Sequence, residues 1–332
     1  MSDDERTAPA DDLSSPVAAP PPADPPPPVQ ATEPLRGKRT KWLLIGAIAL
    51  AVVVVVGGVA GWLLLRHGPQ PRPVALPFTG LHEPYGVAVD AAGNVYIADA
   101  NNTAGNDAGD ANTNRVLKLP AGSTTAFTLP FNGLKNPAGV AVDASGNVYI
   151  ADANNNRVLK LPAGSTGQIE LPFTGLSGPS DVEVDSAGNV YIPDANNNRV
   201  LKLPAGSNTQ IELPFTGLKD PSGVAVDAAG NVYTTDYANH RVLKLPAGSN
   251  TQTELPFTGV NLPEGVAVDA AGAVYITDYW NNRVLKLPAG ANAPIELPFT
   301  GLSHPEAVAV DTAGNVYVTD YGNYRVLKLP KG

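Results

Sequence analysis

Acidic and basic side chains recur in pairs along this chain. Asp152 is followed by Arg157, and similar segments hold equivalent pairs at Asp99–Arg115, Asp194–Arg199, Asp236–Arg241, Asp278–Arg283 and Asp320–Arg325. Charged pairs of this kind serve either catalysis or structure. Because a catalytic pair does not need six equivalent copies, we interpret each pair as a hydrogen-bonded clamp across a turn of the scaffold.

Two further carboxylates break the repeated pattern. Asp181 and Glu183 stand where the equivalent segments mostly have Gly and Ala. A carboxylate within a packed strand needs a partner or a raised pKa. Glu183 therefore either lines a channel or contacts Lys or Asn neighbours, and we interpret it as structural.

Histidines and cysteines indicate no catalytic or metal site. The chain has no cysteine and four histidines, which occupy unrelated positions: His67, His82, His240 and His304. This is unlike a converging set of metal ligands, and no Ser-His-Asp arrangement is suggested. We therefore predict no catalytic residue, no metal and no cofactor.

A sequence repeat determines the elements that hold these residues. The segment LPFTGL begins at Leu76 and recurs with small changes, the later copies standing 42 residues apart, at Leu129, Leu171, Leu213, Leu255 and Leu297. Each unit contains four short runs rich in Val, Ile, Leu and Tyr, bounded by Gly, Pro, Asn and Asp. Four strands in such a period are typical of a propeller blade. Counting the Pro-x-Gly-type starts from Pro84 to Pro305 predicts an all-β, six-bladed β-propeller.

The two ends of the repeat region predict how the ring closes. The last repeat stops at Gly332 after its third strand, whereas one LPF segment at residues 76–78 precedes the first inner strand. We therefore expect residues 74–78 to pair with residues 325–329 as the outer strand of the sixth blade. This pairing removes two free sheet edges.

The repeated motifs resemble a known family. Residues 221–227, 230–236 and 239–242 read PSGVAVD, GNVYTTD and NHRV, and this pattern is similar to the NHL repeat in all six units. The LPFTGL and RVLKLPAGSNTQ segments further resemble the extracellular propeller of a mycobacterial receptor serine/threonine kinase. The resemblance implies an actinobacterial envelope protein with a sensor-like domain. It does not imply kinase activity, because no Gly-rich loop, strand lysine or His-Arg-Asp motif stands before the hydrophobic segment described below.

Aromatic residues mark the places where the repeats differ most. The loop between the second and third strands reads Ala-Asn-Asn-Asn in blades two and three, whereas blades four to six carry aromatic rings there. Rings grouped on one exposed arc are typical of an interaction surface, and drift among tolerant surface loops is the alternative. The predicted binding residues are Tyr85, Tyr237, Tyr279, Trp280, Tyr321 and Tyr324.

An insertion in blade one is the other break in symmetry. It lies between Asp99 and Arg115 and contains Asp107 and Asp110 among many Asn and Gly. The spacing does not match an EF-hand calcium loop. We interpret the insertion as a flexible loop over one face, with Ca²⁺ binding left open.

The residues before the propeller predict a membrane anchor. Residues 1–41 are rich in proline and predict a disordered cytoplasmic tail. Residues 42–65 contain no charge and are long enough for one transmembrane helix, and residues 66–73 form a linker. More basic residues flank the amino end than the carboxyl end, which places the propeller, residues 74–332, outside the plasma membrane. A cleaved signal peptide is the alternative.

Composition and fold together narrow the function. The net charge of −9 argues against nucleic-acid binding. We predict a non-catalytic sensor or docking module of the bacterial envelope, whose loop face binds an envelope protein, a peptide or a glycan. The alternatives are a propeller lyase or hydrolase with a channel metal, and a structural tether between membrane and cell wall.

Overall fold

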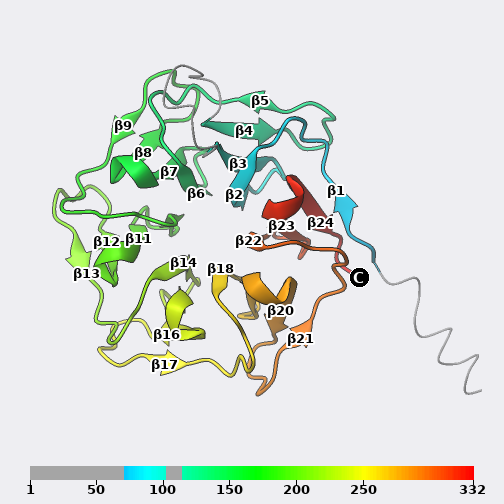
Figure 1. Ribbon diagram of the computed structural model, residues 1–332. Coiled ribbons are helices and arrows are strands. Elements are labelled where there is room, and N and C mark those ends of the chain that lie inside the picture. The colour runs from blue at the N-terminus through cyan, green and yellow to red at the C-terminus, as the bar shows by residue number, and fades with distance from the viewer. Residues whose placement is uncertain (1–70, 102–113) are drawn as a thin grey trace, which may run out of the picture. The chain divides into compact units, whose positions relative to one another are not determined.

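Each sequence repeat forms one four-stranded antiparallel sheet, and six such sheets surround a central axis (Figure 1). The computed structural model describes residues 71–101 and 114–332. The predicted tail, the predicted membrane helix and most of the blade-one insertion lie outside these residues. Within the described ranges, no helix is long and apolar enough to cross a membrane.

The blades are numbered in chain order, beginning with the blade that contains β2. Within each blade the strands are counted from the innermost outward. The innermost strands of blades one to six are β2 (Glu83–Val89), β6 (Pro137–Val142), β10 (Glu183–Val184), β14 (Pro221–Val226), β18 (Pro263–Val268) and β22 (Pro305–Val310). The second strands are β3 (Val95–Ala100), β7 (Val148–Asp152), β11 (Val190–Asp194), β15 (Val232–Asp236), β19 (Val274–Asp278) and β23 (Val316–Asp320).

The outer half of each blade contains the two remaining strands. The third strands are β4 (Arg115–Leu119), β8 (Arg157–Leu161), β12 (Arg199–Leu203), β16 (Arg241–Leu245), β20 (Arg283–Leu287) and β24 (Arg325–Leu329). The outer strands are β5 (Phe127–Thr128), β9 (Ile169–Glu170), β13 (Ile211–Glu212), β17 (Thr253–Glu254), β21 (Ile295–Glu296) and β1 (Val74–Ala75). Single 3₁₀ turns join second and third strands at η1 (Ala153–Asn155), η2 (Ala195–Asn197), η3 (Tyr237–Asn239), η4 (Tyr279–Asn281) and η5 (Tyr321–Asn323).

The ring closes through its first strand, as the sequence predicts. The strand β1 lies beside β24 in blade six, with Val74 opposite Lys328 and Ala75 opposite Leu327. The N–H of Leu76 then donates to the carbonyl of Val326 at 2.9 Å. The six-bladed all-β prediction and the predicted interlock are therefore confirmed, although β1 is shorter than the expected strand at residues 74–78.

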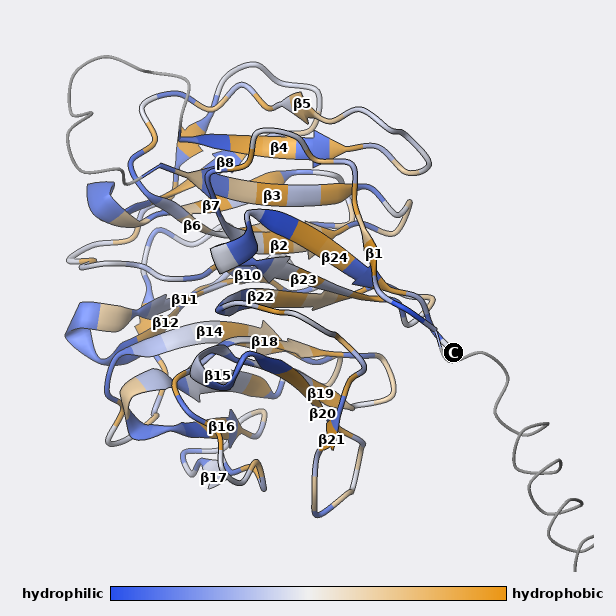
Figure 2. Cartoon of the chain, turned by 45° about the vertical axis from the view of Figure 1, so that its right-hand side comes forward, coloured by the Kyte–Doolittle hydropathy of each residue, from blue (hydrophilic) through white to orange (hydrophobic). Residues whose placement is uncertain are grey.

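The core lies between neighbouring blades. Second strands such as β15 are buried along their whole length, because both faces of the blade pack against other blades. One cluster joins Tyr233 and Val242 of blade four to Ile276 and Leu285 of blade five. In Figure 2 the hydrophobic colour follows strands such as β3 and β4. Apolar packing between blades therefore holds the ring together.

The repeated Asp and Arg form the predicted clamp. Asp152 is fully buried and accepts hydrogen bonds from Arg157 Nε at 2.7 Å, from the N–H of Lys135 at 2.7 Å and from Asn155 Nδ2 at 2.8 Å. The guanidinium of Arg157 also donates to the carbonyl of Gly133. The clamp therefore ties the loop before the innermost strand to the turn between the second and third strands.

Blade three departs from the regular pattern. The expected strand after Pro179 is reduced to the two residues of β10, and Pro179 forms only an isolated bridge with Asp194. Pro193 accepts a hydrogen bond from the N–H of Ser180 at 3.2 Å, so its main chain faces the innermost strand. Proline has no N–H to donate in return, and the ladder is broken there.

Candidate ligand-binding face

One end of the propeller holds both the 3₁₀ turns and the starts of the innermost strands. Pro221 at the start of β14 pairs with Asp236, which immediately precedes η3. The same relation holds in blade six, where Pro305 pairs with Asp320. This end is called the loop face below, and all six predicted aromatic residues belong to it.

Two of these rings meet at the junction of blades six and one. The ring centroids of Tyr85 and Tyr321 lie 5.2 Å apart, with 47° between the ring planes. Burial, together with Glu306, Tyr321 and Glu83, raises the pKa of Tyr85, so its hydroxyl stays protonated. These two packed rings therefore form an uncharged, partly buried surface beside the channel.

A second group of rings spans blades five and six. The His304 ring lies 4.8 Å from the Tyr279 ring and 5.7 Å from the Trp280 ring, as measured between centroids. Trp280 is nevertheless 57% exposed. Tyr279 and Trp280 are predicted from the sequence, but His304 is not, because it comes from the next repeat and only the folded structure brings its ring to η4.

Tyr324 occupies a position that is structural in the other blades. Its φ of 54° lies in the left-handed region, where the equivalent residues of blades two to five are Asn156, Asn198, His240 and Asn282. Those side chains accept a backbone N–H from the next blade, as Asn282 does from His304 at 2.7 Å. A tyrosine cannot make this bond in the same way, and Tyr324 is 60% exposed. Its ring is therefore presented to solvent at some conformational cost.

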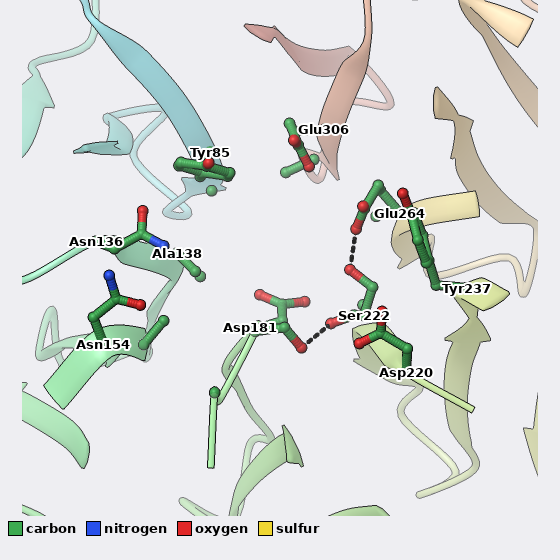
Figure 3. A pocket seen from close by; sticks show the side chains of 18 residues that line it. Tyr85, Asn136, Ala138, Asn154, Asp181, Asp220, Ser222, Tyr237, Glu264 and Glu306 are labelled. Carbon is green, nitrogen blue, oxygen red and sulfur yellow. Dashed lines mark hydrogen bonds between the residues drawn. The ribbon is translucent and has the colours of Figure 1, made fainter. Parts of the chain in front are cut away.

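Tyr237 borders a cavity at the mouth of the central channel. The cavity has a volume of about 360 Å³ and is also lined by Tyr85, Asp181, Glu264 and Glu306. Figure 3 shows these side chains directed toward one space from different blades. Burial, together with Glu264, Glu306 and Asp220, raises the pKa of Tyr237 to about 12.

One repeated sequence position forms much of this mouth. It is the residue after the inner-strand proline, which reads Tyr85, Ala138, Ser180, Ser222, Glu264 and Glu306 in blades one to six. Ser222, Glu264 and Glu306 are not among the residues predicted from the sequence. Their variability beside an otherwise repeated proline was the signal that could have found them.

The acidic groups of the mouth have different partners. The Ser222 hydroxyl donates to Glu264 Oε2, as the dashed line in Figure 3 marks. The carboxylate of Asp181 accepts the N–H groups of Val182 at 2.8 Å and of Val224 at 3.0 Å. Asp181 therefore connects blade three to blade four at a place where the other blades mostly have glycine.

Burial shifts the pKa values of these carboxyl groups upward. It raises the pKa of Asp181 to about 7, although its two backbone hydrogen bonds oppose the shift. Burial likewise raises the pKa of Glu264 to about 8. The Ser222 hydrogen bond opposes this shift, whereas the charges of Asp220 and Asp181 act in the same direction. The pKa of Glu306 is raised well above its ordinary value by burial, Glu264 and Glu83. Ionising the mouth is therefore costly without a cation.

Threonines fix the backbone of the acidic side of the mouth. Thr277 Oγ1 accepts the N–H of Gly265 at 2.7 Å and donates to the carbonyl of Glu306 in the next blade at 2.5 Å. Thr235 and Thr319 make equivalent bonds to the carbonyls of Glu264 and Tyr85. Blades one to three have Ala98, Ala151 and Pro193 at this position. These threonine hydrogen bonds therefore occur only in blades four to six, on the side of the mouth that holds Glu264, Glu306 and most of the aromatic rings.

Glu183 lies deeper in the channel than this mouth. A second cavity is lined by Asp181, Glu183 and the Val and Ala side chains of the innermost strands. Burial raises the pKa of Glu183 to about 8, with Asp181 and Asp185 acting in the same direction. Of the two interpretations from the sequence, channel lining is therefore the one that the structure shows.

The described acidic and histidine side chains do not converge on one point. Among residues 71–101 and 114–332, no three His, Asp or Glu side chains are placed to hold one metal ion. His240 Nδ1 accepts the N–H of Leu262 at 3.1 Å and so joins two blades. Most of the blade-one insertion, with Asp107 and Asp110, lies outside these residues.

Comparison with known proteins identifies the repeat. Four segments match the NHL repeat: residues 134–161, 218–245, 260–287 and 302–329. The NHL repeat is therefore matched in blades two, four, five and six. A stretch of 111 residues is also 51% identical to the serine/threonine-protein kinase PknD of Mycobacterium tuberculosis, which confirms the expected resemblance. This match covers 31% of the chain and only 15% of the kinase.

Solved structures show the same fold at low sequence identity. Virginiamycin B lyase from Staphylococcus aureus superposes with a TM-score of 0.57 at 16% identity, covering 79% of this chain and 88% of the lyase chain. A gluconolactonase from Xanthomonas campestris gives a TM-score of 0.63 at 16% identity, covering 78% of this chain and 89% of its own. These two likenesses concern the fold alone.

Proposed function

We propose that the NHL propeller is a non-catalytic docking module whose loop face binds a protein, peptide or glycan of the bacterial envelope. The observation that carries this proposal is the group of aromatic rings on blades four to six and one. Trp280 and Tyr324 are more than half exposed, although large apolar side chains are elsewhere mostly buried in the described part. Exposed rings beside a cavity favour binding.

Tyr324 adds support from the backbone. In blades two to five the Asn or His at this position accepts an N–H from the next blade, as Asn282 does, whereas the equivalent N–H of blade one, that of Glu83, donates to Asp99 Oδ1 at 3.1 Å. The chain instead has an aromatic ring in a left-handed conformation. A backbone conformation that costs free energy locally is typical of sites that bind a ligand or partner.

We further propose that residues 42–65 anchor the propeller to the plasma membrane, with the amino end in the cytoplasm. This part of the proposal rests on the uncharged segment and its flanking basic residues. The similarity to a segment of PknD supports an extracytoplasmic sensor role. A tether between membrane and cell wall uses the same face and anchor.

A lyase or hydrolase is the second candidate. It is favoured by the fold shared with virginiamycin B lyase and by Glu264, whose raised pKa of about 8 suits a proton donor near neutral pH. Loss of a ring such as Trp280 at the rim affects docking, whereas loss of Glu264 affects proton transfer. The two candidates therefore differ in which variant abolishes function.

The docking proposal is tested with Trp280→Ala. The full chain, purified in detergent and immobilised, is exposed to an envelope extract of the source organism, and the affinity of the retained component is then measured. Removing a central ring of an interface typically costs about 2 kcal/mol, so affinity should fall about 30-fold. Folding should persist, because the exposed indole is not part of the blade core.

The matched control is Asn196→Ala. Asn196 stands at the position of Trp280 in blade three and is exposed. Asn155 is unsuitable as a control because its side chain belongs to the clamp around Asp152. Equal affinity for Trp280→Ala and the unchanged chain, with both folded, would refute the aromatic docking surface.

A further inference from the structure

The cavity at the channel mouth is lined by four carboxyl groups and no positive side chain. Asp181, Asp220, Glu264 and Glu306 all line it, and the lining contains no Lys, Arg or His. Carboxylates gathered in this way repel one another unless they are protonated or a cation enters. The mouth therefore lacks the counter-charge that the rest of the scaffold possesses.

The Arg and Lys side chains of the third strands are used elsewhere. Arg241 is bound to Asp236 at 2.7 Å in the clamp. Lys244 lies over the ring of Tyr233, with its Nζ 5.1 Å from the centroid. The other blades repeat both arrangements, as Arg325 and Lys328 do in blade six. None of these side chains lines the mouth.

Two of the four lining carboxylates, Glu306 and Asp220, accept no hydrogen bond from a described residue. Glu264 accepts the Ser222 hydroxyl and Asp181 accepts two backbone N–H groups, but no described residue donates a hydrogen bond to the Glu306 side chain. Its backbone is nevertheless held by Thr277. Figure 3 shows its side chain at the edge of the cavity, beside Tyr85 and Glu264.

Size and lining favour an organic cation over a bare metal ion as the occupant. The cavity measures about 360 Å³, and the described carboxylates are not placed as a metal-binding group. Two walls are the aromatic rings of Tyr85 and Tyr237. Aromatic faces attract organic cations, and carboxylates bind ammonium groups.

We propose that the channel mouth binds a protonated primary amine on an alkyl stem, with the chemistry of a lysine side chain supplied by the docked partner. The ammonium group lies against Glu306 and Glu264, and the stem passes between Tyr85 and Tyr237. The inference rests on the proposed docking function, in that the aromatic rings hold the partner while the mouth takes its side chain.

The test uses two short peptides and the full chain in a non-ionic detergent at pH 8. The probes are acetyl-Gly-Lys-Gly-amide and the uncharged acetyl-Gly-norleucine-Gly-amide, and binding is measured by saturation-transfer NMR. The lysine probe should bind, and the norleucine probe should bind at least about tenfold more weakly because it lacks the charge. Pentane-1,5-diamine serves as a third probe, which distinguishes a free small amine from the lysine side chain of a polypeptide as the source of the ammonium group. Equal affinity assigns the site to small amines, and weaker binding than the peptide assigns it to a polypeptide.

Two isosteric variants locate the site. Glu306→Gln and Glu264→Gln should each lower affinity for the lysine probe about tenfold, whereas Glu296→Gln should leave it unchanged. Glu296 is an exposed carboxylate of an outer strand, so its variant makes the same change in net charge. Melting curves confirm that each variant is folded. Equal binding of the two probes, or equal effects of all three variants, would overturn the proposal.

Trp280→Ala separates this inference from the docking proposal. The indole does not line the cavity, so this variant should bind the lysine probe normally even where docking of the partner is lost. Loss of partner binding in Trp280→Ala together with no binding of the lysine probe would refute the ammonium site alone. Normal partner binding by Trp280→Ala, together with normal binding of the lysine probe, would refute the aromatic docking surface alone.

Discussion

Carboxylates of the same propeller behave differently because their immediate partners differ. Asp236 is fully buried but accepts hydrogen bonds from Arg241, from Asn239 and from the backbone of Lys219. Glu264 receives one hydroxyl and faces other acids. The oxygens of Asp236 are therefore satisfied by hydrogen-bond donors, whereas burial beside other acids favours the protonated form of Glu264.

Stability should therefore fall as pH rises. The folded pKa values of Asp181 and Glu264, about 7 and about 8, lie above the values near 4 expected in an unfolded chain. A raised folded pKa gives stability that is complete below the unfolded pKa and lost as pH rises through the folded pKa. The melting temperature should drop between pH 5 and pH 9, and Glu264→Gln should flatten this drop.

The other titratable groups at the mouth do not oppose this trend. Glu306 and Glu183 shift in the same direction, and the tyrosines Tyr85 and Tyr237 stay protonated across the range. Glu296→Gln on an outer strand serves as the control and should keep the full slope. A melting temperature that is constant or rises from pH 5 to pH 9 would contradict the expected protonation of the mouth.

At the level of elements, the repeat predicted most of what is observed. Four strands per blade follow from short runs of Val, Ile, Leu and Tyr, and the clamp follows from the repeated Asp and Arg. Both are local features of each unit, so the sequence shows them directly. The break in blade three was not predicted, although Pro193 stands where blades four to six have threonine.

The channel mouth was harder to predict than the blades. Its residues come from consecutive repeats and meet only once the ring closes, as Glu264 and Glu306 do. The predicted aromatic residues lie on the same face, and their role in binding stays a prediction. The place of the His304 ring beside Trp280 and the hydrogen bond from Thr277 to Glu306 likewise depend on contacts between repeats, which no single repeat shows.

The clamp can be tested within one hairpin. Asp236→Asn removes the charge opposite Arg241 and turns an amide toward its donors, so the free energy of unfolding should fall by about 2–4 kcal/mol. Urea denaturation of the full chain measures this change. Glu254→Gln is the control, because Glu254 lies 3.8 Å from the same Arg241 but is 60% exposed.

Exposed ion pairs contribute at most about 1 kcal/mol, so the control should change little. Equal losses in the two variants would show that the buried carboxylate is not the main support of the β15–η3–β16 hairpin. A loss confined to Asp236→Asn would instead locate the stabilisation in the buried network of hydrogen bonds.

For the whole molecule, closure of the ring is a long-range event. Within the described residues, β1 is the strand that joins a blade whose other strands, β22 to β24, lie at the opposite end of the sequence. Leu76 and Phe78 also pack against a cluster that contains residues of blades one and six. Because residues 76–82 lead from β1 directly into β2, the pairing of β1 with β24 links the last blade to the first.

Replacing residues 74–78 with Gly-Ser repeats should open this junction. The variant loses the pairing with β24 and the packing of Leu76 and Phe78, and it exposes a strand edge. Loss of large core side chains costs about 3 kcal/mol or more, which lowers the melting temperature of a domain of this size by about 6–10 °C. Calorimetry of the full chain measures this.

The same replacement at residues 127–131 provides the control. It removes the outer strand β5 together with Leu129 and Phe131, which occupy the equivalent places in blade one. The packing lost is similar, but blade one remains joined to its neighbours by the chain on both sides. Because only the first replacement frees the two ends of the ring, its melting temperature should fall further and its transition should become less cooperative. Equal melting temperatures for the two variants would show that β1 is an ordinary outer strand and that packing of blade six against blade one is sufficient to close the propeller.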